Sequence, residues 1–136
     1  MDNFVMTDLT AYYETVKDKG SLRTLDHAHR WSTAVLKTLG FTLGGKTKKK
    51  LANALPKELG DDVKRVFWLA HFKNDQLTSH EFQNQVSRRS GNSDPQFAKI
   101  PITAVFHGVK QIVDSNVQQA VADALSPEVR ELWEQA

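Results

Sequence analysis

The sequence contains no cysteine, little glycine and proline, and no long apolar run. Without cysteine there is no disulfide, no thiol nucleophile and no zinc–thiolate site. Only 7 glycines and 4 prolines among 136 residues exclude collagen-like and low-complexity chains. No stretch approaches the roughly 18 apolar residues that cross a bilayer, so we expect no membrane association. Residues 1–6 carry an acid and no signal-peptide pattern, which favours a cytoplasmic protein.

The composition is that of an ordinary globular protein, with 40% hydrophobic and 25% charged residues, and it predicts one domain over residues 1–136. The charge is unevenly distributed along this chain. Residues 1–16 sum to −3, residues 17–73 to +8 and residues 74–136 to −3, giving the net +2. Most of the basic character therefore belongs to one segment, and a basic segment indicates an acidic partner.

The two halves of the sequence resemble each other. At an offset of 70 residues, residues 12–59 align with residues 82–129 without a gap and with nine identities. Further along, Trp68 corresponds to Trp133. We predict two copies of one helical unit, spanning about 8–72 and 78–134.

The apolar residues recur every three or four positions, which predicts helices throughout. We expect an all-α bundle of about eight helices, four in each unit. The predicted helices cover about 8–19, 24–39, 47–55 and 61–72, then a helix opening at residue 78 and helices over about 94–109, 116–125 and 127–134.

Particular residues predict where helices begin and end. The sequence Thr78–Glu81 has the form of a capping box, in which each side chain satisfies a backbone amide near the helix start. Gly20 is expected to end the first helix in the left-handed conformation, and Gly40 to end the second. Pro101 lies inside a predicted helix, so we expect a kink or short break there.

Several short motifs recur in this chain, namely Thr33–Val35, Leu51–Pro56, Glu81–Phe82, Val86, Thr103–Val105, Ala122–Leu125 and Glu131–Trp133. With them the chain resembles, over roughly residues 8–134, an uncharacterised bacterial family catalogued as domain of unknown function 2267. The resemblance implies a small cytoplasmic helical protein with two repeats, and it brings no established activity or catalytic residues.

The segment Gly40–Thr47 matches the pattern G-x-x-x-x-G-K-T of phosphate-binding loops. In such a loop the glycines let backbone amides surround the phosphates, the lysine contacts them and the threonine binds Mg²⁺. The chemistry needs a buried strand before the loop, and residues 30–39 have helical periodicity instead. We therefore predict a helix end followed by a turn. A weaker phosphate or nucleotide site at Gly45, Lys46 and Thr47, beside Lys48, remains an alternative.

The run of residues 46–50 is rich in lysine and supplies half of the excess charge of residues 17–73. A run of this kind is most often a solvated helix surface, but it also suits electrostatic binding of nucleic acid. No aromatic residue is interleaved with it and no groove-reading module is recognisable. Other basic residues available to the same face are Arg23, Arg30, Lys37, Lys57, Lys64 and Arg65.

The histidines and tryptophans favour no further site. His27 and His29 lie two residues apart and cannot chelate one ion from a regular helix. His71, Asp75, His80 and Glu81 lie around the link between the units, where Glu81 already has a capping role. Trp68 and Trp133, which occupy equivalent positions in the two units, are expected in the core, and Trp31 on the inner face of its helix. We predict no metal site, no cofactor and no catalytic residues.

We therefore expect a non-catalytic helical interaction module with a basic face in its first unit. Its expected partner is another protein or a second copy of the chain. The alternative is a nucleic-acid or polyanion binder, and the residues predicted to make the contact are Lys46, Thr47, Lys48, Lys49 and Lys50.

Overall fold

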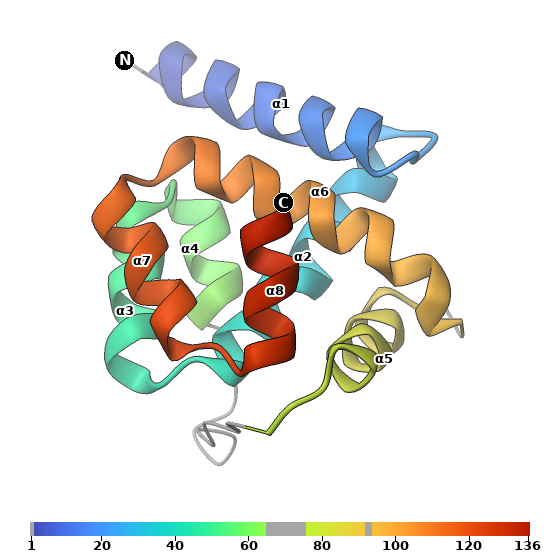
Figure 1. Cartoon of the computed structure of the whole chain (residues 1–136). Coiled ribbons are helices and arrows are strands. Elements are labelled where there is room, and N and C mark those ends of the chain that lie inside the picture. Colours follow the sequence, from blue (N-terminus) through green and yellow to red (C-terminus); the bar gives the residue numbers. More distant parts are fainter. Residues whose placement is uncertain (1, 65–75, 92–93) are drawn as a thin grey trace.

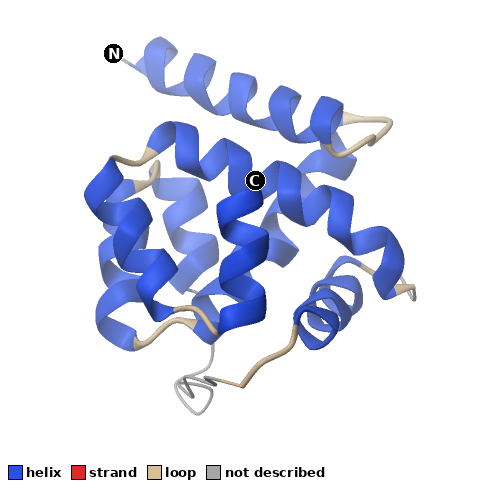
Figure 2. Cartoon of the chain, viewed as in Figure 1, coloured by secondary structure: helices blue, strands red, loops and turns tan. Residues whose placement is uncertain are grey.

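The computed structural model describes residues 2–64, 76–91 and 94–136, and side chains from residue 9 onward within them (Figure 1). These residues form eight α-helices and a short 3₁₀ helix, with no strand among them, so the predicted all-α bundle is confirmed (Figure 2). The elements are α1 (Asp2–Lys19), α2 (Leu25–Thr42), α3 (Gly45–Ala54), α4 (Lys57–Lys64), α5 (Ser79–Ser90), η2 (Pro95–Ala98), α6 (Lys99–Ile112), α7 (Ser115–Ala124) and α8 (Pro127–Gln135).

The two halves of the chain are interleaved. The helix α1 packs along α6 at the top of Figure 1 and also touches α2, whereas α5 packs against α2. Each half thus places its first helix on the second helix of the other half. Because α2 also contacts α6 and α3 contacts α7, one hydrophobic cluster draws its side chains from both halves.

Three aromatic side chains form the centre of the core where α5, α6 and α8 meet. The ring of Phe106 lies 5.8 Å from that of Phe82 and 5.2 Å from that of Trp133, the second pair nearly edge to face. The rings of Phe82 and Phe106 are fully buried and Trp133 is 2% exposed. Trp133 is therefore in the core as predicted, and Trp31, which is 3% exposed, lies on the inner face of α2 as predicted. Trp68, the other tryptophan expected in the core, lies outside the described residues.

The two helix starts predicted at Thr24 and Thr78 are confirmed, whereas α1 begins at Asp2 and not near residue 8, and α4 begins at Lys57 and not near residue 61. The hydroxyl of Thr24 accepts from the backbone amide of His27 at 3.0 Å at the start of α2. The capping box of α5 is complete, because the Thr78 hydroxyl accepts from the Glu81 amide at 3.0 Å and the Glu81 carboxylate accepts from the Thr78 amide at 3.3 Å. Satisfying these otherwise free amides fixes where each helix begins.

The helix α1 ends at Lys19 as predicted, but the residue in the left-handed region after it is Ser21, with φ 56°, and not Gly20. The amide of Leu22 donates to the carbonyl of Lys17 at 2.9 Å, as in a Schellman ending. The helix α2 does not end at Gly40 but continues to Thr42.

The expected break at Pro101 is also absent. Pro101 is the third residue of α6, within the first helical turn, where backbone amides have no partner inside the helix. Its missing amide therefore leaves no hydrogen bond unmade. The change of geometry comes earlier, where η2 passes directly into α6 at Lys99.

The division into two repeated units stays a prediction. Several aligned positions are buried in both halves, including Val16 with Val86 and Leu51 with Val121. The aligned helices α3 and α7 have 10 residues each and end at the aligned residues Leu55 and Leu125. These observations agree with a duplicated unit but do not test its ancestry.

Candidate functional site

The lysines of residues 46–50 do not all point the same way. In α3 the side chains of Lys46, Lys49 and Lys50 are exposed, at the helical spacing i, i+3, i+4 that places residues on one face. We call these three residues the lysine face. Thr47 is half-buried and Lys48 only 8% exposed, and burial lowers the pKa of the Lys48 ammonium. The predicted five-residue contact thus reduces to three outward lysines.

The N-terminus of α3 is less protected than that of its counterpart α7. At the start of α7, the carboxylate of Asp114 accepts from the amide of Val117 at 3.0 Å. The aligned residue before α3 is Gly44, which has no side chain to do the same. The positive end of the α3 dipole therefore lies beside Lys46, and both favour an anion.

The phosphate-loop pattern does not form a phosphate-binding loop. Its first glycine, Gly40, is inside α2, and Leu43, which ends α2, is buried. Within the part of the chain that the structure describes no strand exists to precede such a loop. Residues 40–47 therefore form a helix end, a short connection and a helix start.

The other basic residues predicted for this face lie, where the structure describes them, before α2 or on α2 and α4, and not on α3. Arg23 precedes α2 and Lys46 follows it, so an 18-residue helix, about 27 Å long, separates them. Lys57 is exposed but its ammonium lies 3.0 Å from the Asp61 carboxylate. Arg30 and Lys64 are exposed on α2 and α4, Lys37 is half-buried, and Arg65 lies outside the described residues. The lysine face is thus a local feature of α3.

Sequence reasoning missed a polar cluster joining α1, α2 and α4. The Glu58 carboxylate accepts from the Tyr13 hydroxyl at 3.3 Å and lies 2.9 Å from Nε2 of His29. Burial, together with the nearby Glu58 carboxylate, raises the pKa of the Tyr13 hydroxyl. Tyr13 lies 16 positions before His29, and His29 lies 29 positions before Glu58, so no local sequence motif could reveal the cluster. None of the described cavities is lined by His29 or Glu58, and we assign the cluster to helix packing.

Asp62 is a buried carboxylate beside this cluster. It is 8% exposed and accepts from the Thr33 hydroxyl at 3.1 Å. Its burial outweighs the hydrogen bond from Thr33 and raises the pKa of the Asp62 carboxyl above the ordinary 3.8. The folded state therefore keeps the proton of Asp62 to a higher pH than the unfolded chain does.

Replacing Asp62 by asparagine is therefore expected to stabilise the protein at neutral pH. The raised pKa means that ionising Asp62 costs stability as pH rises above 3.8, and asparagine keeps the acceptor for Thr33 without that cost. Urea unfolding of D62N and the parent should show the gain at pH 7 and a smaller gain at pH 3. A loss of stability at pH 7 would show that Asp62 is held by compensating charges.

The histidines and acids do not assemble a metal site in the described part of the chain, where no group of three His, Asp or Glu residues converges. Two members of the sequence-predicted group, His71 and Asp75, lie outside the described residues. His80 is exposed, and Glu81 is engaged in the capping box.

Comparison with known proteins identifies a family without an assigned activity. The family described as uncharacterized conserved protein, DUF2267, matches residues 10–132. No curated protein matches the chain. Among the helices of the described residues, none is both long and apolar enough to cross a membrane.

Proposed function

We propose, since the chain belongs to the DUF2267 family of uncharacterised conserved proteins, that it is a non-catalytic binding module whose contact surface is the lysine face of α3. The observation that carries this proposal is the exposure of Lys46, Lys49 and Lys50 on one side of a helix. The charges at these positions do not contribute to packing of the core, because the three side chains are exposed. The aligned residues of α7 are Asn116, Gln119 and Ala120, which are uncharged.

The partner of such a face carries negative charge. Two lysine faces would repel each other. A second copy could therefore bind there only through residues 74–136, whose net charge is −3. An acidic surface of another protein satisfies the same requirement. Exposed ion pairs each contribute little, about 0.2–1 kcal/mol, so three lysines alone favour a weak and salt-sensitive association.

Nucleic acid is the second candidate partner, favoured by the start of α3. Its uncapped amides and the dipole of the helix add to the positive charge of Lys46, as in helix termini that hold phosphate. Contacts to phosphates alone would give binding without sequence preference, with a Kd of about 10⁻⁴ to 10⁻⁶ M at physiological salt.

Replacing Lys46, Lys49 and Lys50 together by glutamine tests both candidates. For a fluorescent DNA duplex titrated by anisotropy, the variant should bind more weakly at low salt. Its plot of log K against log salt should be shallower by about 2–3 units, since each phosphate contact contributes about 0.9. The same variant should also lose binding to an acidic polypeptide such as polyglutamate if the partner is a protein.

The matched control replaces three exposed cations away from α3, namely Arg23, Arg88 and Lys99, by glutamine. It changes net charge by the same amount, so it separates the lysine face from the general charge of the molecule. Equal weakening by both triple variants would contradict a localised contact surface. Absence of any binding to duplex and polyglutamate at low salt would contradict the proposal altogether.

A further inference from the structure

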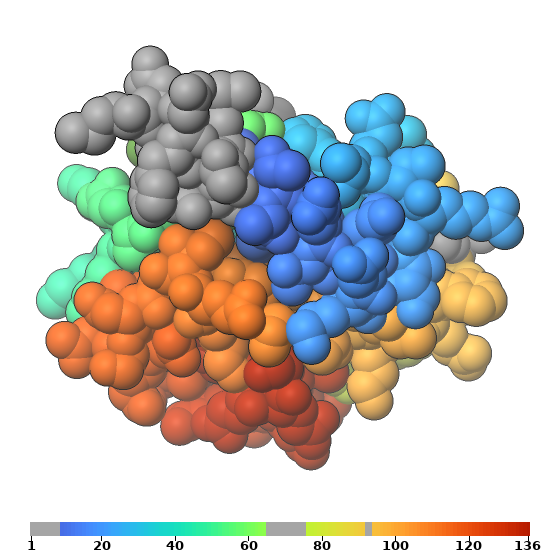
Figure 3. Space-filling view, turned by 90° about the horizontal axis from the view of Figure 1, so that it is seen from above, coloured from blue at the N-terminus to red at the C-terminus, as the bar shows by residue number. Residues whose placement is uncertain are grey.

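A cavity of about 600 Å³ lies between the end of α1, the first half of α6 and the end of α8. Its size falls in the range of small-molecule sites, which is about 300–1,000 Å³. Figure 3, seen from above, shows the C-terminal part of α1 resting on α6, with α8 beyond it. Residues more than 80 positions apart in sequence therefore meet there, and no sequence motif marks the place.

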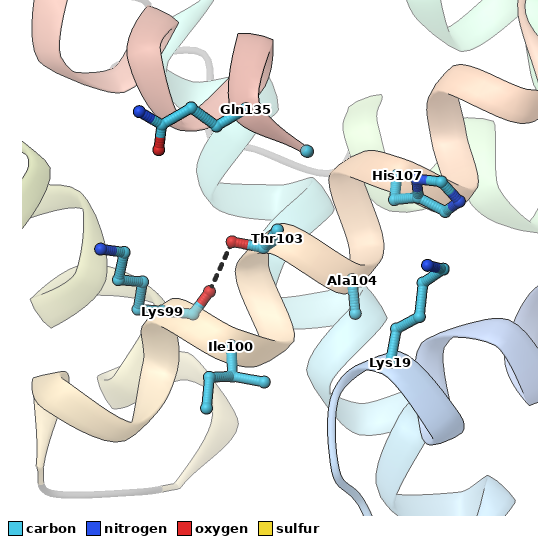
Figure 4. Close-up of a pocket in the computed structure, with 8 residues that line it drawn as sticks. Lys19, Lys99, Ile100, Thr103, Ala104, His107 and Gln135 are labelled. Atoms are coloured by element: carbon cyan, nitrogen blue, oxygen red, sulfur yellow. Dashed lines mark hydrogen bonds between the residues drawn. The ribbon is translucent and has the colours of Figure 1, made fainter.

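The floor of the cavity is apolar. Ala104 of α6 is almost fully buried, while Ile100, one turn earlier, is 54% exposed. An isoleucine exposed to this extent gains about 25 cal/mol for each Å² that a ligand removes from water. Thr103 lies between Ile100 and Ala104 in sequence. Its hydroxyl donates to the Lys99 carbonyl at 2.9 Å, so its proton is already used within the helix (Figure 4).

One end of the cavity is lined by two basic side chains, Lys19 and His107. Lys19 of α1 extends toward His107 of α6, as Figure 4 shows. Burial, and then the positive charges of Lys19 and Lys110, lower the pKa of the His107 imidazole, so an anion bound beside it would raise that pKa. No Asp or Glu side chain of the described residues lines this cavity.

Two neighbouring lysines are less available to a ligand than Lys19. The ammonium of Lys110 already donates to the backbone oxygens of Trp133, at 2.8 Å, and Ala136, at 3.0 Å. Lys99 also borders a smaller adjoining cavity whose lining includes Glu128 and Glu131. Lys19 makes no ion pair or hydrogen bond within the described residues, so the anionic end of a ligand belongs at Lys19 and His107.

We propose that this cavity binds a small amphiphilic carboxylate, with its carboxylate between Lys19 and His107 and its apolar chain along Ala104 and Ile100. The carboxylate matches the basic side chains and the apolar chain matches the apolar floor. A purely apolar or purely anionic ligand would match only one of these two parts. The site is separate from the lysine face of α3, so it does not depend on the function proposed above.

Titration of the protein with decanoate, below the concentration at which decanoate forms micelles, tests this assignment. In ¹H–¹⁵N spectra, saturable shifts should gather on the amides of Ile100 and residues 102–107. Lys19→Gln should weaken binding about fivefold, as expected for losing about 1 kcal/mol from a partly exposed ion pair. Ile100→Ser should weaken it without changing the protein's charge.

The matched control is Lys17→Gln on the same helix, which removes the same charge from a residue that does not line the cavity. It should leave the affinity for decanoate unchanged, while decanol and acetate should each bind several-fold more weakly than decanoate. Equal effects of Lys17→Gln and Lys19→Gln, or acetate binding as tightly as decanoate, would overturn the proposal. Shifts confined to other residues, or no saturation up to about 10 mM decanoate, would also overturn it.

Discussion

Replacing Gly40 by alanine is expected to lower the free energy of unfolding by about 3 kcal/mol. Gly40 lies inside α2 where this helix packs on α4, and a Cβ atom there would be 2.1 Å from the carbonyl oxygen of Val63. That oxygen belongs to the backbone and cannot move aside as a flexible side chain would. The two helices would have to separate, and core contacts on both would loosen.

The matched control for Gly40→Ala is the other glycine of the same motif, Gly45. A Cβ atom on Gly45 meets nothing within 4 Å, and its φ is not positive. Alanine also costs less than glycine in a helix, so Gly45→Ala should raise stability by about 0.4–1 kcal/mol. Urea or thermal unfolding of the two variants gives the comparison. A loss below about 1 kcal/mol in Gly40→Ala would mean that α2 and α4 are less tightly packed than described.

Replacing Phe106 by alanine is expected to cost about 3–5 kcal/mol of stability. Phe106 is fully buried and its ring touches both Phe82 and Trp133, so truncation leaves a cavity where α5, α6 and α8 meet. Such a loss is a large share of the roughly 5–15 kcal/mol that holds a domain together. Phe106→Leu, which leaves a smaller cavity, should lose clearly less.

The control for Phe106→Ala is Phe97→Ala on the surface. Phe97 is 65% exposed, and surface substitutions of this kind usually change stability by less than about 0.5 kcal/mol. Equilibrium unfolding in urea, followed by tryptophan fluorescence for Phe97→Ala and by circular dichroism for both, gives the values. Similar losses in the two variants would show that the centre of the core is not where the structure places it.

Local signals in the sequence determined the elements of this fold. The apolar spacing gave the helices, Thr24 and Thr78 gave two of their starts, and the residues that identify the family lie mostly in the core. These predictions succeeded because helix periodicity and capping act between residues three or four positions apart.

Two local predictions failed because their outcome depends on where the residue lies in the packed helix. Gly40 has the chemistry of a helix stop, yet α2 continues through it because α4 packs against it there. Proline usually breaks a helix, yet Pro101 lies in the first turn of α6, where its missing amide removes no helical hydrogen bond. In both cases the residue type was recognised and its position in the packed helix was not.

By itself, then, the sequence determined an all-α fold, the family and an excess of lysine in one segment. Only the tertiary structure decided which lysines face outward, since the rotation of α3 about its axis buries Lys48 and exposes Lys49. It also decided that Lys19 and His107 share a cavity and that Glu58 joins Tyr13 to His29. The physical reason is that charge and periodicity are properties of neighbouring residues, whereas burial and convergence arise from how whole helices pack.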